Sequence, residues 1–376
     1  GNAVLAKPAE QTPLIAHLGV SLMHQAGVPV SALQLLPGDG ELGGALTAHG
    51  GASGVAFTGS TETALRIRAS LAEHAAPGTP LIAETGGLNA MIVDSTALPE
   101  QAVRSVIESA FQSAGQRCSA LRCLYVQADI APAFTEMLIG AMEALNVGNP
   151  WTLATDVGPV IDEVARAGIE AHIATATQEG RLLHRLKTPT SGTFVAPALI
   201  KVHGIADLER EVFGPVLHLA TFEASELDAV IDDINASGYG LTFGLHSRID
   251  DRVQHVSDRI VAGNVYVNRN QIGAIVGSQP FGGVGLSGTG PKAGGPDYLS
   301  RFRGAHPAPV AGSWDAEAPL PTCPNRPKEP LDSTPLPGPT GESNVLSHAS
   351  RAAILCAGPG AETVATQAEV VASLGG

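Results

Sequence analysis

The sequence predicts an α/β protein built on a parallel sheet that helices cover. Its first third alternates short apolar segments that have the length and composition of strands, "GVAFTGS", "TPLIAETGG" and "LNAMIVD", with the helical pattern "TETALRIRASLAEHA". This alternation is typical of a parallel sheet. Ligands of such sheets bind beyond the carboxyl ends of the strands, and Gly59, Ser60 and Glu84 fall at such ends.

The next predicted element is a helix followed by a turn that carries a cysteine. Apolar residues between positions 103 and 111 recur at helical spacing, and Gly115 suits the end of such a helix. Cys118 then lies in the turn before "LRCLYVQ", which predicts a strand that buries Cys123. The neighbours of Cys118 are small or polar, so this position is either an ordinary turn or a place where a thiol is presented.

The rest of the chain divides into three parts by composition and pattern. Strand and helix patterns continue in "TFVAPALI", "PVLHLATF", "ELDAVIDDINAS" and "NVYVNRN". Residues 307–342 are rich in proline, serine, threonine and charge, which predicts an extended linker. The closing segment "RAAILCAGPGAETVATQAEVVASLGG" predicts a strand, a glycine-rich turn and a helix, the start of a further α/β domain.

A glycine-rich run, "GGVGLSG", contains a formal GxGxxG at Gly283, Gly285 and Gly288. A dinucleotide fingerprint follows a strand and opens a helix. This run instead continues into more glycine and proline, so we interpret it as a loop.

Composition excludes several classes of function. The chain has 376 residues, of which 44% are hydrophobic, and its net charge is −14. An acidic chain is a poor partner for nucleic acid or anionic membranes, and no apolar run approaches the ~20 residues of a transmembrane helix. The 4 cysteines form no CxxC pair, which predicts reduced cytoplasmic thiols and no metal site. The first residues, "GNAVLAKPAEQTP", begin abruptly, so we expect a piece of a longer protein.

Cys118 and Glu84 together suggest a reaction, although the sequence does not fix the distance between them. A nucleophilic thiol needs a nearby group that manages protons, and a carboxylate can do this or activate water. Either residue alone has an ordinary explanation: an inert thiol, or a surface carboxylate at a strand end.

Four segments in order, "AETGGLNA", "GQRCSA", "EVFGPV" and "PFGGVGLSGTG", resemble the aldehyde dehydrogenase superfamily over residues 1–305. Three further segments, "GNAVLAKPAEQTP", "NRNQIGAIVGSQPFGG" and "GTGPKAGGPDYL", resemble one branch of it. This branch is the pyrroline-5-carboxylate dehydrogenase half of the bifunctional bacterial proline utilisation A family. "PLPGPTGESN" resembles the stretch that leads into the C-terminal domain of the same family.

The resemblance implies roles for individual residues. Cys118 would be the nucleophile and Glu84 the general base. The residues that would bind NAD are Lys7 and Glu10 at the adenosine ribose, Gly59 and Ser60 at the pyrophosphate, and Glu211 at the nicotinamide ribose. The residues that would bind the substrate are Ser119, Gly273 and Ala274 at its carboxylate and Phe281 along its aliphatic chain.

Two residues, Glu10 and Arg117, each have an alternative explanation. Glu10 has two explanations. It favours NAD over NADP, because a carboxylate repels a 2′-phosphate, or it lies in the first turn of a helix, where the helix dipole favours an acidic residue. Arg117 favours the thiolate of Cys118, or it is an outward-facing partner of a salt bridge.

The resemblance also implies an aldehyde dehydrogenase-like fold with a particular division of the chain. The expected segments are 1–86, the C-terminal part of a Rossmann-type NAD-binding domain; 87–285, the catalytic domain; 286–306, a return to the cofactor or oligomerisation region; 307–342, the linker; and 343–376, the start of a C-terminal α/β domain. FAD is expected only in an upstream proline dehydrogenase domain outside this chain. We expect a cytoplasmic homo-oligomer for the full-length protein.

The implied reaction is NAD-dependent oxidation of L-glutamate γ-semialdehyde to L-glutamate. Another semialdehyde dehydrogenase is a rival. One that acylates coenzyme A is an example, although transfer to a thiol needs no water-activating Glu84. A non-catalytic piece kept for assembly is a second rival. We expect the isolated 376-residue chain to be poorly soluble and essentially inactive.

Overall fold

The structure is a computed structural model that describes residues 2–303, 330–349, 354, 356 and 360–373. Its contacts divide the chain into two compact units. The first contains residues 1–75, 80–273 and 282–291, and the second contains residues 76–79, 274–281 and 292–376. The boundary expected near residue 86 lies inside the first unit, and the predicted division into domains stays a prediction.

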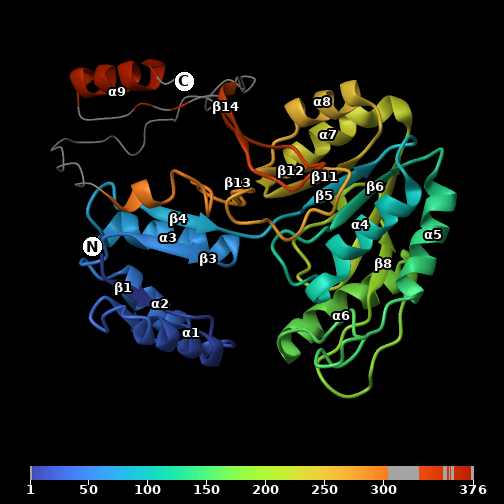
Figure 1. Cartoon of the computed structure of the whole chain (residues 1–376), viewed down its shortest axis with the longest axis horizontal. Coiled ribbons are helices and arrows are strands. Elements are labelled where there is room, and N and C mark those ends of the chain that lie inside the picture. The colour runs from blue at the N-terminus through green and yellow to red at the C-terminus, as the bar shows by residue number, and fades with distance from the viewer. Residues whose placement is uncertain (1, 304–329, 350–353, 355, 357–359, 374–376) are drawn as a thin grey trace. The chain divides into compact units, whose positions relative to one another are not determined.

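A seven-stranded sheet is the centre of the first unit (Figure 1). Its strands, in spatial order, are β12 (Asn264–Val267), β11 (Thr242–His246), β5 (Ala90–Val93), β6 (Cys123–Gln127), β9 (Val216–Phe222), β8 (Ala198–Lys201) and β7 (Leu182–Arg185). All neighbouring strands are parallel except β7, which runs antiparallel to β8. The predicted α/β class with a parallel sheet is confirmed.

Helices cover both faces of this sheet because successive side chains of a strand point to opposite faces. Met91 and Val93 of β5 belong to one apolar core, while Ala90 and Ile92 belong to the other. The first core is covered by α4 (Pro99–Phe111), α5 (Ala131–Glu143) and α6 (Glu163–Gln178). The second is covered by α7 (Leu227–Ala236) and α8 (Asp250–Arg259).

Smaller strand pairs accompany the large sheet. The parallel pairs are β1 (Val4–Ala6) with β2 (Leu33–Leu35) and β3 (Val55–Thr58) with β4 (Leu81–Glu84); the antiparallel pair is β10 (Tyr239–Gly240) with β13 (Val284–Gly285). The accompanying helices are α1 (Pro13–Gln25), α2 (Gly40–Thr47) and α3 (Thr61–His74). The strands of the first third thus belong to three separate sheets among the described residues, with β5 in the large one.

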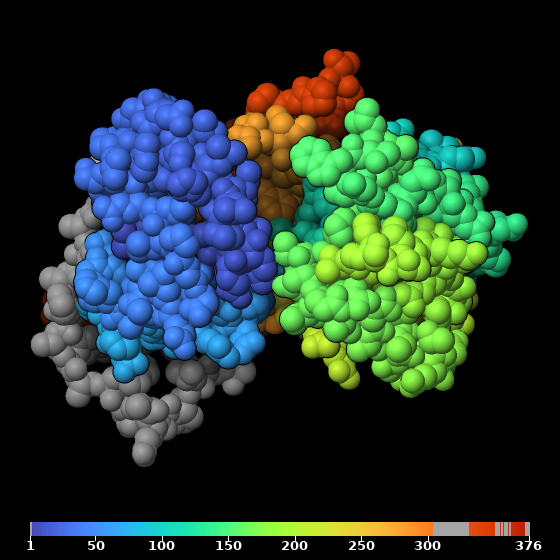
Figure 2. Space-filling view, turned by 90° about the horizontal axis from the view of Figure 1, so that it is seen from below, coloured from blue at the N-terminus to red at the C-terminus, as the bar shows by residue number. Residues whose placement is uncertain are grey.

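Helix α1 lies at the surface of the first unit. It has no buried residue, and Leu14 and Ile15 are 84% and 66% exposed. Figure 2 presents this blue N-terminal part of the chain on the visible side. The apolar residues of α1 therefore contact little of the rest of the described chain.

Short 3-10 turns complete the first unit: η1 (Gln112–Gly115), η2 (Ile205–Asp207) and η3 (Ala224–Glu226). The second unit contains η4 (Leu299–Phe302), an antiparallel pair of β14 (Pro330–Leu336) with β15 (Asn344–Ala349), and α9 (Ala361–Ser373). Strand β14 lies inside the predicted linker at 307–342. This segment forms a strand, although it contains Pro330 and Pro335, because its backbone pairs with β15. Residues 304–329 of that linker and most of the strand predicted near residue 354 lie outside the described residues.

Within the described part of the chain, no helix is long and apolar enough to cross a membrane.

Candidate active site

Cys118 lies in a tight loop between α4 and β6. After α4 ends, Ser113, Ala114 and Gly115 all have positive φ, at 56°, 53° and 65°. A Cβ on Gly115 would lie 2.1 Å from the carbonyl oxygen of Gly214, so only glycine permits this approach. Left-handed backbone at two non-glycine residues costs roughly 1–3 kcal/mol each, and such strain gathers at functional sites. The loop leaves Cys118 half-buried.

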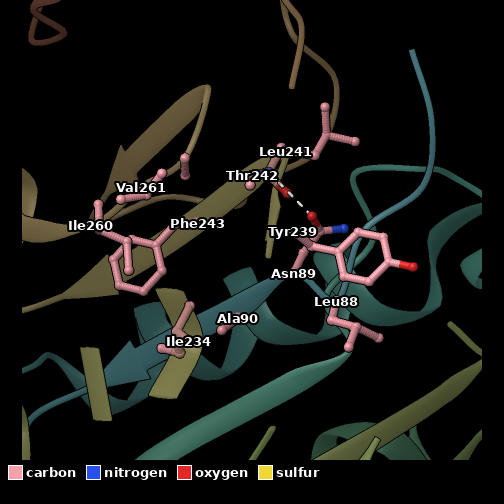
Figure 3. A pocket seen from close by; sticks show the side chains of 12 residues that line it. Leu88, Asn89, Ala90, Ile234, Tyr239, Leu241, Thr242, Phe243, Ile260 and Val261 are labelled. Atoms are coloured by element: carbon pink, nitrogen blue, oxygen red, sulfur yellow. Dashed lines mark hydrogen bonds between the residues drawn. The ribbon is translucent and has the colours of Figure 1, made fainter. Parts of the chain in front are cut away.

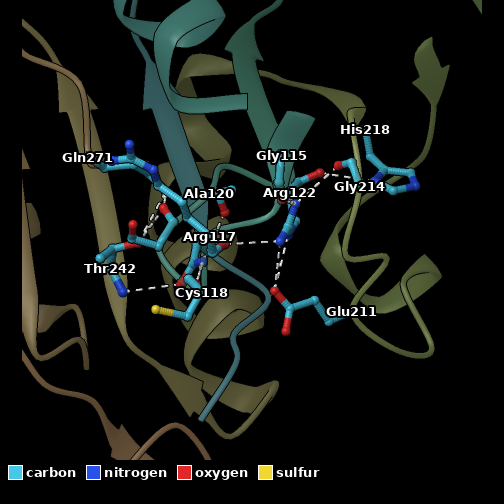
Figure 4. A network of polar contacts seen from close by, with 12 residues as sticks. Gly115, Arg117, Cys118, Ala120, Arg122, Glu211, Gly214, His218, Thr242 and Gln271 are labelled. Carbon is cyan, nitrogen blue, oxygen red and sulfur yellow. Dashed lines mark hydrogen bonds and ion pairs between the residues drawn. The ribbon is translucent and has the colours of Figure 1, made fainter. Parts of the chain in front are cut away.

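Arg122 lies beside this loop and holds it through hydrogen bonds (Figure 4). Its side chain is only 1% exposed, and its guanidinium donates to the carbonyl oxygens of Gly115 at 2.7 Å and Arg117 at 3.1 Å. The same guanidinium donates to Glu211 Oε1, from Nη2 at 2.9 Å and from Nε at 3.2 Å. One buried cation therefore joins the cysteine loop to the "EVFGP" segment.

The Glu211 carboxylate lies against the backbone that follows β4. A Cβ on Gly86 would lie 1.8 Å from Glu211 Oε2, and the N–H of Gly87 donates to this carboxylate. Burial raises the pKa of Glu211, while the charge and hydrogen bonds of Arg122 lower it. The glycine pair of "ETGG" thus makes the space that this carboxylate occupies.

Glu84 is the last residue of β4, and the glycine-rich run holds its carboxylate. Glu84 Oε2 accepts from the N–H of Gly283 at 2.8 Å, and a Cβ on Gly288 would lie 3.0 Å from both carboxylate oxygens. The N–H of Thr85 donates to the carbonyl oxygen of Ser287 at 2.9 Å, which fixes the run along β4. Two of the three glycines of the GxGxxG run, Gly283 and Gly288, therefore lie against a carboxylate.

Burial and the carboxylates of Glu211 and Glu84 raise the pKa of the Cys118 thiol. Burial raises the pKa of Cys118 above its ordinary value of 9.0, and the negative charges of Glu211 and Glu84 raise it further. The backbone N–H groups of Ser119 and Cys118 hydrogen-bond the sulfur and lower that pKa. The structure thus brings the predicted nucleophile and the predicted base close enough to interact.

The residues predicted to hold NAD follow strands of the small pairs. Ser60 caps α3, with its Oγ accepting from the N–H of Thr63 at 3.1 Å, and the N–H of Gly59 donates to the carbonyl oxygen of Glu84 at 3.2 Å. Gly59 and Ser60 therefore lie where the N-terminus of a 14-residue helix meets the end of β4, a position that suits a phosphate. The roles of Gly59, Ser60 and Glu211 in binding NAD stay predictions.

Lys7 follows β1, and its Nζ donates to the carbonyl oxygen of Pro8 at 2.7 Å. Glu10 is exposed in a turn. Because α1 begins at Pro13, Glu10 is not a first-turn residue of a helix, and that alternative is wrong.

The predicted substrate residues divide between the two units. Ser119 is 5% exposed beside Cys118, and Gly273 has a φ of 71°. Arg117 Nη1 lies 3.8 Å from where a Cβ on Gly273 would be, and its Nε donates to Ser113 Oγ at 3.1 Å. Ala274 and Phe281 belong to the second unit, so their roles stay predictions.

Sequence reasoning missed two residues of the site, Arg122 and Asn89. Arg122 interrupts the otherwise apolar segment "LRCLYVQ", and a charge there is a signal of a buried partner. Asn89 donates from Nδ2 to the carbonyl oxygens of Cys118 at 2.6 Å and Ala120 at 2.9 Å. Among the described residues, no group of three or more His, Cys, Asp or Glu side chains could hold a metal ion.

A half-buried loop cysteine whose pKa two carboxylates raise, on an α/β fold with the N-terminus of α3 at the end of β4, is typical of the aldehyde dehydrogenase class. The aldehyde dehydrogenase family matches residues 1–305, and the chain belongs to it.

Individual proteins of this family also match the chain, and they belong to a narrower group. The chain is 46% identical to the bifunctional protein PutA of Klebsiella aerogenes, over 100% of this chain and 32% of the relative. A crystal structure of a bifunctional proline utilization A (PutA) protein matches with a TM-score of 0.79 at 56% identity, over 80% of this chain and 31% of that one. The 1-pyrroline-5-carboxylate dehydrogenase from Thermus with bound NAD matches with a TM-score of 0.75 at 35% identity, over 80% of this chain and 59% of that one. The chain thus spans about a third of the length of its PutA relatives.

Proposed function

We propose that this chain carries an NAD-dependent aldehyde dehydrogenase that oxidises L-glutamate γ-semialdehyde to L-glutamate in proline catabolism. The observation that carries the proposal is the half-buried Cys118, on a loop that Arg122 ties to Glu211, with negative charges of Glu211 and Glu84 near enough to raise its pKa. The names of the PutA and 1-pyrroline-5-carboxylate dehydrogenase relatives support the substrate.

The residues of this chain would perform the chemistry in the following order. Because the pKa of Cys118 is raised, the resting site holds a thiol, and a base must take its proton before the sulfur attacks the aldehyde carbon. The new carbon–sulfur bond makes a thiohemiacetal, and the N–H groups of Cys118 and Ser119 stabilise its oxyanion. NAD⁺ supplies an acceptor for the hydride that leaves this carbon, so that a thioester on Cys118 remains.

Glu84 would complete the cycle. Its carboxylate takes a proton from water, and the resulting hydroxide attacks the thioester carbon. The carbon–sulfur bond breaks, the product leaves as a carboxylic acid, and the sulfur returns as the thiolate. The hydrogen bond from the N–H of Gly283 holds this carboxylate at the end of β4.

Glu211, Gly59 and Ser60 would bind the cofactor, with Lys7 and Glu10 at its adenosine end. Ser119, Gly273, Ala274 and Phe281 would bind the semialdehyde, whose carboxylate suits the hydroxyl of Ser119 and backbone N–H groups. We retain as further proposals a homo-oligomeric, cytoplasmic full-length protein and an FAD-binding proline dehydrogenase domain outside this chain. The predicted segments 286–306 and 343–376 also stay proposals.

The test replaces Cys118 and, as a matched control, Cys123, which is fully buried in β6. In the complete gene product, we expect Cys118→Ser to lower NADH formation from glutamate semialdehyde on the order of 10³-fold or more while NAD binding persists. Cys123→Ser should keep most of the activity. NADH formation by Cys118→Ser at a rate near that of the wild type would remove the assigned nucleophile and support the non-catalytic alternative.

A further inference from the structure

The amide of Asn89 lies beneath the cysteine loop and is almost completely buried, with the residue 3% exposed. Its Nδ2 donates to the carbonyl oxygens of Cys118 and Ala120. Its Oδ1 accepts from the N–H of Thr242 at 3.1 Å, the hydrogen bond drawn in Figure 3. The orientation of the amide is therefore determined, because two acceptors lie on one side and a donor on the other. The interactions span 29, 31 and 153 residues of sequence.

The direction of the Cys118 carbonyl decides the direction of the next N–H. In a trans peptide unit, the C=O of one residue and the N–H of the following residue point in opposite directions. Asn89 draws the Cys118 carbonyl towards β5, so the N–H of Ser119 points away from β5. That N–H is one of the two that hydrogen-bond the Cys118 sulfur.

The neighbouring peptide units are held separately. Arg122 Nη2 and the N–H of Ala120 bind the carbonyl oxygen of Arg117, and Thr242 Oγ1 donates to that of Ser119 at 3.1 Å. Asn89 holds the peptide unit between Cys118 and Ser119 through the hydrogen bond at 2.6 Å. It also donates to the carbonyl oxygen of Ala120 at 2.9 Å, but the next N–H, of Leu121, is held separately by the carbonyl oxygen of Ser109 at 3.0 Å.

We propose that Asn89 is a positioning residue that aims the Ser119 N–H at the reacting sulfur and at the oxyanion that forms next to it. The proposal deepens the proposed function and rests on Cys118 as the nucleophile. Asn89 touches neither substrate nor sulfur; it acts by fixing one peptide plane. Losing this orientation removes a donor that stabilises negative charge both on the thiolate and in the transition state.

The test uses two variants of the complete gene product. Asn89→Asp keeps an acceptor for the N–H of Thr242 but places an oxygen against two carbonyls, and Asn89→Ala removes the contact without that repulsion. The readout is the pH dependence of iodoacetamide alkylation at Cys118, assigned by peptide mapping. We expect the alkylation midpoint to move upwards by about one pH unit, and kcat to fall ~10–100-fold with little change in the KM for NAD.

Asn235 offers a matched control. Its amide makes the same kind of clamp between α7 and the segment that follows α8, donating to the carbonyl oxygen of Arg259 at 3.0 Å and accepting from the N–H of Val261 at 2.8 Å. Asn235→Asp should lower thermal stability and leave the Cys118 alkylation profile unchanged. Thermal unfolding and NAD binding report whether each variant is folded.

An unchanged alkylation midpoint and kcat in a folded Asn89 variant would overturn the positioning role. A shift of the same size in Asn235→Asp would also overturn it, because the effect would then be general loosening. Failure of the proposed function would give a different result. Cys118→Ser would then keep its NADH formation, while the alkylation of Cys118 in the Asn89 variants would still test the positioning role.

Discussion

At the scale of single residues, the chemistry of Cys118 is set by opposed influences. Burial and the charges of Glu211 and Glu84 favour the thiol, while two backbone N–H groups favour the thiolate. A site with this balance holds its nucleophile protonated until a base and a substrate are present. Such protection suits a reactive thiol, which is otherwise open to oxidation.

Removing the charge of Glu211 should make the thiol more reactive. Glu211→Gln keeps the size of the side chain but removes the largest charge effect on Cys118. The pKa of Cys118 should fall, and alkylation by iodoacetamide at pH 8, a value below the thiol's pKa, should become about two- to fivefold faster. Glu209→Gln is the matched control, because Glu209 is exposed two residues away. Equal or slower alkylation in Glu211→Gln would contradict this electrostatic account.

At the scale of elements, the loop before β6 depends on one glycine. Gly115→Ala would bring a methyl group within 2.1 Å of the Gly214 carbonyl oxygen, which forces the cysteine loop to move. Gly180→Ala is the control, since Gly180 has a similar φ of 71° but nothing within 4 Å of the added Cβ. Both variants should lose about 1 kcal/mol of stability to backbone strain, and only Gly115→Ala should also lose most NADH formation. Comparable activities of the two variants would show that the close approach does not matter.

Strand β9 and helix α6 bring together a histidine pair, His218 and His172, next to the backbone of Arg122. His218 Nδ1 lies 2.9 Å from the Arg122 carbonyl oxygen, so it donates, and its Nε2 then accepts from His172 Nε2 at 2.9 Å. Burial lowers the pKa of His218 to about 4; the hydrogen bond to the Arg122 carbonyl opposes this shift, and the charges of His172 and Arg122 add to it. The neutral imidazole is thus required by the fold.

This pair predicts acid sensitivity. The pKa of His218 is about 4 in the folded protein and 6.5 ordinarily, so its contribution to stability is full above pH 6.5 and is lost as pH falls towards 4. The loss should reach roughly 2–3 kcal/mol. His218→Gln should flatten the decline of the thermal unfolding midpoint over this interval, while the exposed His17→Gln should not. Parallel declines in wild type and His218→Gln would remove His218 as a cause.

At the scale of the whole molecule, the sequence predicted the class of fold, while the roles assigned to Cys118 and Glu84 stay predictions. Strand–helix alternation is a local signal, so β3, α3, β4 and β5 could be predicted from it. The separation of β3–β4 from β5 could not, because strand pairing depends on partners distant in sequence.

The residues that support the site could not be predicted from the sequence, because their partners are also distant along the chain. Arg122 meets Glu211 across 89 positions, and the carboxylate of Glu84 meets Gly283 across 199. The expectation that the isolated chain is poorly soluble stays a prediction, and the exposed apolar side chains of α1 support it.

The central claim is that Cys118 carries the acyl group and that Glu84 releases it by activating water. The most direct measurement is rapid mixing of Glu84→Gln, in the complete gene product, with glutamate semialdehyde and NAD⁺, followed by mass spectrometry of the quenched protein. The account predicts a burst of about one NADH per site, slow turnover afterwards, and an acyl group on the peptide that contains Cys118. Steady turnover at the wild-type rate, or a burst with no acyl group on that peptide, would contradict it.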